Sequence, residues 1–354
     1  MTETRSLYSD ILRTFSVFCV IVLHVASGRF NQLPINNFTW EVANVFDSLV
    51  RWTVPVMVMI SGSFFLDPTK DIPTKKIYTK YLFRIILALI VWGGVYKTRN
   101  LLVEYFINGA NINLKIIIKQ FIKIPLGNAH YHLWYLYMLI GIYVLVPVYR
   151  IFIKHARKKD IEYLIKIFII FGITFNFIKN TSRWVHPLLQ FSSYSFSELI
   201  SYSGYFFAGY YFKKYPVSKN FFYIIISLGL LAFLTTIIAT SLITKKTGSP
   251  NELFFGNLYP LTLLESFFVY LVFKALFENK TFKRQQMIII TLSNYSFGIY
   301  LIHALIIEEL SRIGVNANTM HSLFSIPLIS LAVFMISLCI VFIIKRFKFS
   351  RFIT

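Results

Sequence analysis

The chain has 354 residues, of which 56% are hydrophobic and 14% are charged, and its net charge is +21. A soluble globular domain has about 45–50% apolar and about 25% charged residues, so this composition excludes one. The apolar residues form continuous runs near the length of about 20 residues that a transmembrane helix needs, and continuous runs exclude an alternating β-barrel. Lysine and arginine fall mainly in short segments between the runs, which favours orientation in a membrane over nucleic-acid binding.

We predict an all-α polytopic membrane protein, a bundle of about ten transmembrane helices that forms one domain over residues 1–354 with no appended soluble domain. Most basic residues fall in the segments that are cytoplasmic if the amino terminus is cytoplasmic, so the positive-inside rule predicts that both termini lie inside (N-in/C-in). The predicted spans are 8–27, 44–66, 81–103, 132–152, 161–178, 200–212, 221–243, 258–277, 289–310 and 322–344.

The first span carries three ionisable side chains, Asp10, Arg13 and His24. A charge at the centre of a bilayer costs roughly 2.5–3.5 kcal/mol, so such residues pair with each other, line a wet cavity or take part in chemistry. Asp10 and Arg13 have the i,i+3 spacing of neighbours on a helix surface, and we expect them to pair. Arg13 and His24 fall within about 20° of the same helix face, about 16 Å apart along the axis.

The second and third spans add a small-residue pair and basic residues. Arg51 lies near the outer end of the second span, where Pro55 is expected to kink the helix, and Ser61-Gly62 lies near the inner end. Small residues let a neighbouring backbone or a ligand approach closely, and both interpretations stay open. Lys80 and Arg84, at the start of the third span, are either anchors that reach the lipid headgroups or a cradle for a polyanionic donor.

Histidines occur at two further places in the apolar runs. His130 and His132 precede and open the fourth span, and their spacing offers no third ligand for a metal, so we expect no metal site. His303 lies near the middle of the ninth span, with Tyr300 one turn before it. A lone buried histidine is often a packed, hydrogen-bonded residue, but an ionisable group inside a membrane is by default a functional candidate.

Taken in order, these fragments resemble the membrane acyltransferase-3 family along nearly the whole chain. Three further stretches resemble a stand-alone O-acetyltransferase of a cell-envelope glycan within that family: residues 38–46, Arg51 and residues 303–307. Ser63 stands where the family usually has an aromatic residue. The fragments that carry the family resemblance are Asp10-x-x-Arg13-x10-His24, Pro55 with Ser61-Gly62, Arg84 after basic residues, His132-Leu133-Trp134, and Ser296 to His303.

The resemblance implies transfer of an acetyl group from cytoplasmic acetyl-CoA to a sugar hydroxyl of a polysaccharide or of its lipid-linked precursor, in the bacterial inner membrane. A neutral imidazole suits the removal of a hydroxyl proton near pH 7, so His24 is the candidate base, or alternatively the carrier of the acetyl group. We expect one central cavity to connect Arg13 with His24. The candidate site residues are His24, Arg13, Asp10 and His303 for catalysis, Arg84, Lys80, Ser61 and Tyr300 for the donor, and Arg51 and His132 for the acceptor.

The alternative function is a transporter or flippase of lipid-linked sugars, which needs similar polar residues inside an apolar bundle. Transporters usually contain internal repeats, and the sequence shows none, which disfavours this alternative. Neither function involves nucleic acid; the expected partners are acetyl-CoA, a glycan acceptor and the lipid bilayer.

Overall fold

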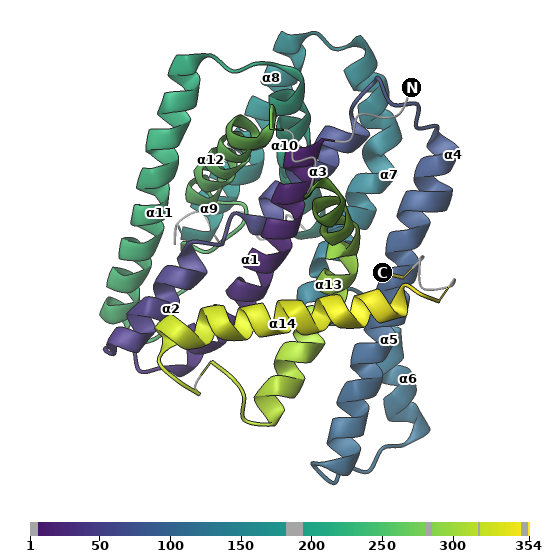
Figure 1. Cartoon of the computed structure of the whole chain (residues 1–354), viewed down its shortest axis with the longest axis vertical. Coiled ribbons are helices and arrows are strands. Elements are labelled where there is room, and N and C mark those ends of the chain that lie inside the picture. The colour runs from purple at the N-terminus through teal and green to yellow at the C-terminus, as the bar shows by residue number, and fades with distance from the viewer. Residues whose placement is uncertain (1–5, 182–193, 281–284, 318, 348–352) are drawn as a thin grey trace.

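The computed structural model describes residues 6–181, 194–280, 285–317, 319–347 and 353–354 (Figure 1). Within these ranges every regular element is helical, which confirms the predicted all-α polytopic membrane fold. Nine described helical stretches are long and apolar enough to cross a membrane: Leu7–Gln32, Phe38–Phe65, Thr74–Phe106, Tyr131–His155, Lys158–Ile178, Lys219–Thr247, Pro260–Phe277, Gln286–Arg312 and Ser322–Ile344.

Each of these stretches corresponds to one predicted span, with ends that differ by a few residues, and the tenth, at 200–212, lies inside a helix that is not among the nine. Several spans consist of more than one helical segment, with π-helical turns at Ile77–Leu82 and Phe168–Thr174. The helices are α1 (Leu7–Gln32), α2 (Phe38–Ser48), α3 (Thr53–Phe65), α4 (Thr74–Lys76), α5 (Phe83–Phe106), α6 (Leu114–Ile122), α7 (Trp134–His155), α8 (Lys158–Ile167), α9 (Phe175–Thr181), α10 (Tyr194–Lys214), α11 (Lys219–Thr247), α12 (Pro260–Phe277), α13 (Gln286–Arg312) and α14 (Ser322–Ile344).

The second span differs from the prediction because it is broken between α2 and α3. We expected one helix kinked at Pro55, but this residue lies in the first turn of α3, where a missing amide hydrogen costs nothing. The turn before α3 is held by its own side chains: the Trp52 indole donates to the Leu49 carbonyl (2.8 Å), and Arg51 pairs with Asp47 (2.5 Å). The indole bond satisfies a carbonyl that the end of α2 leaves open, and the ion pair places opposite charges together at the break.

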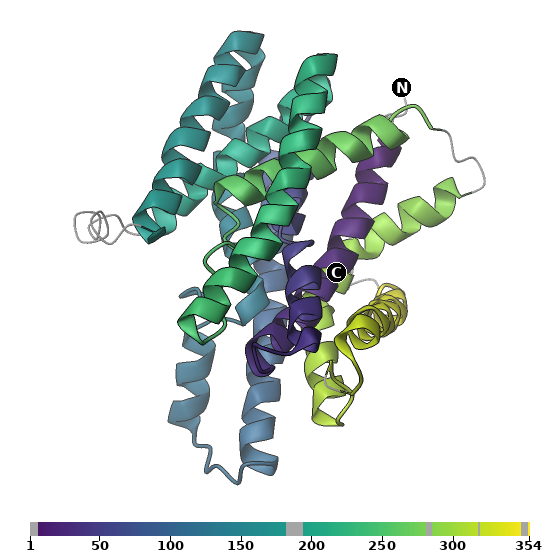
Figure 2. The same ribbon diagram turned by 90° about the vertical axis from the view of Figure 1, so that its left-hand side faces the viewer.

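Helix α1 is the centre of the bundle and contacts α2, α3, α12, α13 and α14. Helix α14 runs across the bundle in Figure 1 and is seen end-on in Figure 2, while α5 and α6 extend together at the lower end in both views. Because α1 touches so many partners, its polar residues are placed against several different helices.

Helices α3 and α10 pack so closely that only glycine fits at two positions. A Cβ on Gly62 would lie 1.8 Å from the Phe206 carbonyl oxygen, and one on Gly209 would lie 1.9 Å from the Met59 carbonyl oxygen. Residues 201–210 of α10 are all buried, so this helix lies inside the bundle. Gly62 therefore serves helix packing, the first of the two interpretations left open by the sequence.

Several basic segments that the positive-inside rule assigned to the cytoplasm meet at one end of the bundle, the upper end in Figure 1. Arg150, in α7, donates to the backbone carbonyls of Phe65, the last residue of α3, and of Asp67 and Lys70 in the loop that follows. Lys213, in α10, pairs with the Asp67 carboxylate at 2.7 Å. Burial alone would raise the pKa of Asp67, but hydrogen bonds from Lys213 and Thr69 outweigh it and hold that pKa below its ordinary value. We call this the basic end.

Candidate active site

Two adjoining cavities open into the bundle near the basic end. One, of about 260 Å³, is lined by Arg13, Ser61 and Arg84 among others. The other, of about 420 Å³, is lined by Arg13, Ser61, Lys70 and Lys213 among others. Because they share Arg13 and Ser61, we treat them together as the basic cavity. Its size is in the range of small-molecule and cofactor pockets, and its cations suit an anionic ligand.

Asp10 and Arg13 are paired, as their spacing predicted. The Arg13 guanidinium lies 3.7 Å from the Asp10 carboxylate, and the Ser293 hydroxyl joins the two. This hydroxyl donates to Asp10 Oδ1 (2.6 Å) and accepts from Arg13 Nη1 (3.2 Å). The Asp10 side chain is 4% exposed and that of Arg13 is 37% exposed, so the carboxylate is buried and the guanidinium faces the cavity. The pair holds α1 against α13.

Arg84 and Lys80, proposed together for the donor, are separated in the structure. Arg84 lines the basic cavity; it donates to the Thr354 carbonyl (2.5 Å), and its guanidinium lies 5.1 Å from the centre of the Phe297 ring. Lys80 is exposed and lines neither part of the cavity. Arg84 is thus the member of this pair that a ligand in the cavity would meet.

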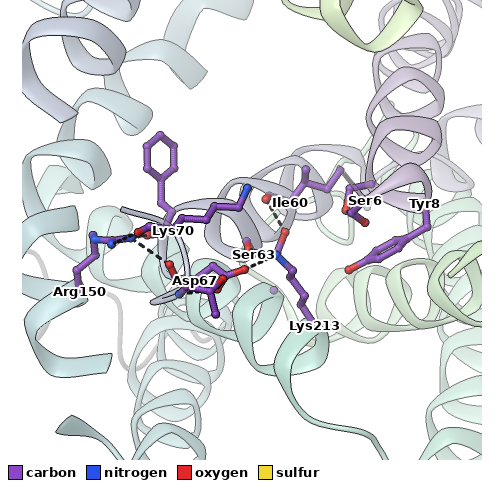
Figure 3. A network of polar contacts seen from close by, with 12 residues as sticks. Ser6, Tyr8, Ile60, Ser63, Asp67, Lys70, Arg150 and Lys213 are labelled. Atoms are coloured by element: carbon purple, nitrogen blue, oxygen red, sulfur yellow. Dashed lines mark hydrogen bonds and ion pairs between the residues drawn. The ribbon is translucent and has the colours of Figure 1, made fainter. Parts of the chain in front are cut away.

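Two lysines that the sequence did not single out contribute to the wall of the basic cavity. Figure 3 shows Lys213 between the Ser63 carbonyl, to which it donates at 3.1 Å, and the Asp67 carboxylate. The Lys70 ammonium lies 3.8 Å from the centre of the Phe64 ring. Both lysines were visible in the sequence as basic residues beside a span, but nothing there distinguished them from ordinary anchors. Ser63, the departure from the family pattern, lies in this network.

Deeper along α1, four histidines from three segments form a second polar group, which we call the histidine cluster. His24 comes from α1, His130 and His132 precede α7, and His303 comes from α13. The His24 and His303 rings are stacked with centroids 5.2 Å apart, His303 and His132 are 5.0 Å apart, and His132 and His130 are 5.0 Å apart. Among the residues that the structure describes, no set of three or more His, Cys, Asp or Glu side chains is arranged to hold a metal ion.

Hydrogen bonds orient three of these rings. His303 Nδ1 lies 2.6 Å from the Tyr300 carbonyl oxygen, and His132 Nδ1 lies 2.9 Å from His130 Nδ1. His130 Nε2 lies 2.9 Å from a carboxylate oxygen of Glu308. The Nε2 atoms of His132 and His303 are buried and have no hydrogen-bond partner within the described part of the chain. Such buried polar atoms are rare and call for an explanation.

In the described part of the chain, Arg13 and His24 line different cavities, whereas we expected one cavity to connect them. His24 lines a separate cavity of about 80 Å³, which shares no lining residue with the basic cavity. Tyr135 lines the basic cavity and contacts Tyr300 (ring centroids 5.4 Å apart). The Tyr300 hydroxyl donates to the His132 carbonyl, and its ring packs against the histidine rings. The rings of Tyr135 and Tyr300 thus lie between the basic cavity and the histidine cluster. We call these two rings the aromatic layer.

Arg51, proposed for the acceptor, is buried at the break between α2 and α3. It pairs with Asp47, its guanidinium lies 3.8 Å from the centre of the Phe255 ring, and it lies within electrostatic reach of His24. The sequence alone did not single out Asp47, although its i,i+4 spacing from Arg51 was a usable signal.

Glu265 is also fully buried and accepts a hydrogen bond from Thr236 at 2.7 Å.

The comparisons with known proteins identify the family. A family model described as an acyltransferase domain, Acyl_transf_3, matches residues 6–346. No curated protein and no solved structure gives a significant match to the chain. The match covers the basic cavity, the histidine cluster and all nine candidate spans, and so the chain belongs to the acyltransferase-3 family and is a multi-pass membrane acyltransferase.

Proposed function

We propose that the protein is an O-acetyltransferase of the bacterial inner membrane. It would move an acetyl group from cytoplasmic acetyl-CoA to a sugar hydroxyl of a cell-envelope polysaccharide or of its lipid-linked precursor. The family supports acyl transfer. The observation that carries the rest is that one helix, α1, presents Arg13 to a cationic cavity and His24 to a cluster of imidazoles.

The basic cavity suits the donor. Coenzyme A carries phosphates, and guanidinium groups bind phosphate through two parallel hydrogen bonds. Arg13 and Arg84 line the cavity near Ser61, with Lys70 and Lys213 toward the basic end. In this proposal the nucleotide phosphates bind these cations, and the arm that carries the thioester extends toward the aromatic layer.

The histidine cluster suits the acceptor. A sugar hydroxyl becomes a competent nucleophile when a base removes its proton in the transition state. In the proposed reaction His24 takes this proton while the hydroxyl oxygen forms the ester C–O bond and the thioester C–S bond breaks. The proton then passes to the departing sulfur, so no other reactant is needed. Movement of Tyr135 and Tyr300 would bring the thioester to His24.

The acceptor class rests on the resemblance of residues 38–46, Arg51 and residues 303–307 to the O-acetyltransferase of enterobacterial common antigen, a cell-envelope glycan. Arg51 and His132 are the proposed acceptor-binding residues. The family match supports acyl transfer rather than transport of lipid-linked sugars.

Radiolabelled acetyl-CoA tests this function. Purified protein in lipid nanodiscs is incubated with the label and with glycan extracted from a bacterial envelope, and we expect label in the glycan. His24→Ala should lower the rate by about 10²- to 10⁴-fold, the range for removal of a general base. His155→Ala, at an exposed histidine in the last turn of α7, is the matched control and should keep the wild-type rate. Label that remains on CoA with the wild-type protein would refute the transferase proposal.

A further inference from the structure

His130, a member of the histidine cluster, and Glu308 have no part in the proposed reaction, and they connect the buried rings of the cluster with the protein surface. His130 bonds to His132 through their Nδ1 atoms (2.9 Å) and to Glu308 through Nε2 (2.9 Å). The side chain of His130 is 7% exposed and that of Glu308 is 24% exposed, whereas His132 is 1% exposed. The three residues therefore form a continuous chain from the buried cluster to a partly exposed carboxylate. Arg99 pairs with Glu308 at 2.7 Å and is the last member of this chain of contacts.

The partners of this chain determine which nitrogen carries each proton. An ionised carboxylate only accepts hydrogen bonds, so His130 Nε2 must donate to Glu308. In neutral His130 the Nδ1 atom is then an acceptor, and His132 Nδ1 must donate to it. The remaining nitrogen of His132, Nε2, carries a lone pair. This atom is the one that is buried without a hydrogen-bond partner in the described structure.

Neighbouring rings show where the lone pair can act. His132 lies beside His303, which in turn stacks on His24. His303 Nδ1 points to the Tyr300 carbonyl, so its Nε2, also buried without a partner in the described chain, is an acceptor too. The cluster thus offers unoccupied acceptor nitrogens beside the candidate base and is suited to receive a proton or to bind a hydroxyl hydrogen.

We propose that Glu308 and His130 are positioning residues of a relay that holds His132 as a second proton acceptor in the histidine cluster. This inference rests on the proposed function and deepens it. When His24 takes the acceptor proton, the positive charge is shared with His132 and stabilised by the Glu308 carboxylate through His130. The proton returns through His24 to the departing sulfur, so the relay stores charge during transfer and changes no stoichiometry.

Other charged and titratable groups face the relay. Arg99 opposes Glu308, Arg51 lies within electrostatic reach of His24, and the Tyr96 ring stacks on His130 at 4.0 Å. Glu308 is the carboxylate that contacts the cluster directly, through its ion pair with His130. Removal of this negative charge should therefore make the imidazoles harder to protonate.

The neighbouring Glu309 provides a matched control. Both carboxylates pair with Arg99, at 2.7 Å and 2.8 Å, but the ion pair with His130 is made by Glu308. We expect Glu308→Gln to lower kcat by about 10- to 100-fold, the range known for partners that orient metal-bound histidines, with little change in KM for acetyl-CoA. Its acidic pH limb should move to lower pH, because the base has lost its stabilising anion. Glu308→Asp should restore part of the rate, and Glu309→Gln should behave as wild type.

A spectroscopic measurement tests the relay without any acceptor. Nitrogen-15 NMR of histidine-labelled protein in nanodiscs, assigned with single-histidine variants, should show the proton of His132 on Nδ1 and that of His130 on Nε2. Glu308→Gln should change the His130 signals, and Glu309→Gln should not. A His132 proton on Nε2, or equal pH limbs in the two glutamine variants, would overturn the relay while leaving acetyl transfer standing. Absence of transfer by the wild-type protein would instead overturn the proposed function.

Discussion

Replacement of Gly62 by alanine should destabilise the protein through the contact between α3 and α10. The added Cβ would lie 1.8 Å from the Phe206 carbonyl oxygen, whereas ordinary contacts begin at 3.4 Å, so the two backbones must separate by about 1.6 Å. Overpacking of a well-packed core costs about 1–3 kcal/mol. The obstacle here is backbone rather than a flexible side chain, so we expect a cost near the upper end, about 3 kcal/mol.

Gly94→Ala is the matched control for this measurement. Gly94 also lies inside a helix, but its Cβ would meet only the Phe121 ring, at 3.7 Å. Both substitutions gain the same helix preference of about 0.5–1 kcal/mol, so their difference isolates the clash. On the entropy scale of globular proteins, a 3 kcal/mol loss in a chain of this length lowers Tm by about 4 °C.

Thermal unfolding of the purified variants in one detergent gives the readout. Gly209→Ala should be destabilised like Gly62→Ala, and the double variant should lose less than the two single losses added together, because both act on one contact. A Gly62→Ala protein that melts at or above the temperature of Gly94→Ala would refute the packing argument. The Ser61 hydroxyl lies next to this contact, so a shift of α3 should also raise KM for the donor.

Two further predictions concern the basic end. Arg84→Gln should raise KM for acetyl-CoA about tenfold, the equivalent of one hydrogen bond to a charged group, while Lys80→Gln, outside the cavity, should leave KM unchanged in initial-rate assays. Asp67 has a lower pKa in the folded protein, so its pairing with Lys213 stabilises the fold fully above the ordinary value of 3.8, and this stabilisation is lost as pH falls below that value. Melting temperatures measured from pH 7 to pH 3 should therefore fall more steeply for wild type than for Asp67→Asn; parallel curves would contradict this assignment.

Much of the fold could be predicted because long apolar runs have few alternatives in a membrane. The break between α2 and α3 could not, because the turn at residues 49–52 contains neither glycine nor proline. It depends instead on the Trp52 indole, which donates to the open Leu49 carbonyl, and on the ion pair between Arg51 and Asp47. The pairing of Asp10 with Arg13 was predictable because it is local.

The sequence singled out several residues that line the two cavities, such as Arg13, Arg84 and His24, but it did not indicate that the cavities are separate. Helix periodicity puts Arg13 and His24 on one face, yet it contains no information on Tyr135 and Tyr300, which come from other helices and separate the two sites. His130 was underestimated for a different reason. Its backbone is extended (φ −160°, ψ 156°), which lets a histidine meet another two residues away, a contact that helical spacing forbids.

The aromatic layer has a consequence for hydrolysis of the donor in the absence of an acceptor. In the proposed reaction, a thioester bound in the basic cavity would be separated by Tyr135 and Tyr300 from the imidazoles, which would activate water as readily as a sugar hydroxyl. Opening of these rings only when an acceptor occupies the far side would let the cell keep the enzyme loaded without leaking acetyl groups. How closely the two tyrosine rings pack, more than the basicity of His24, would then determine the rate of donor hydrolysis.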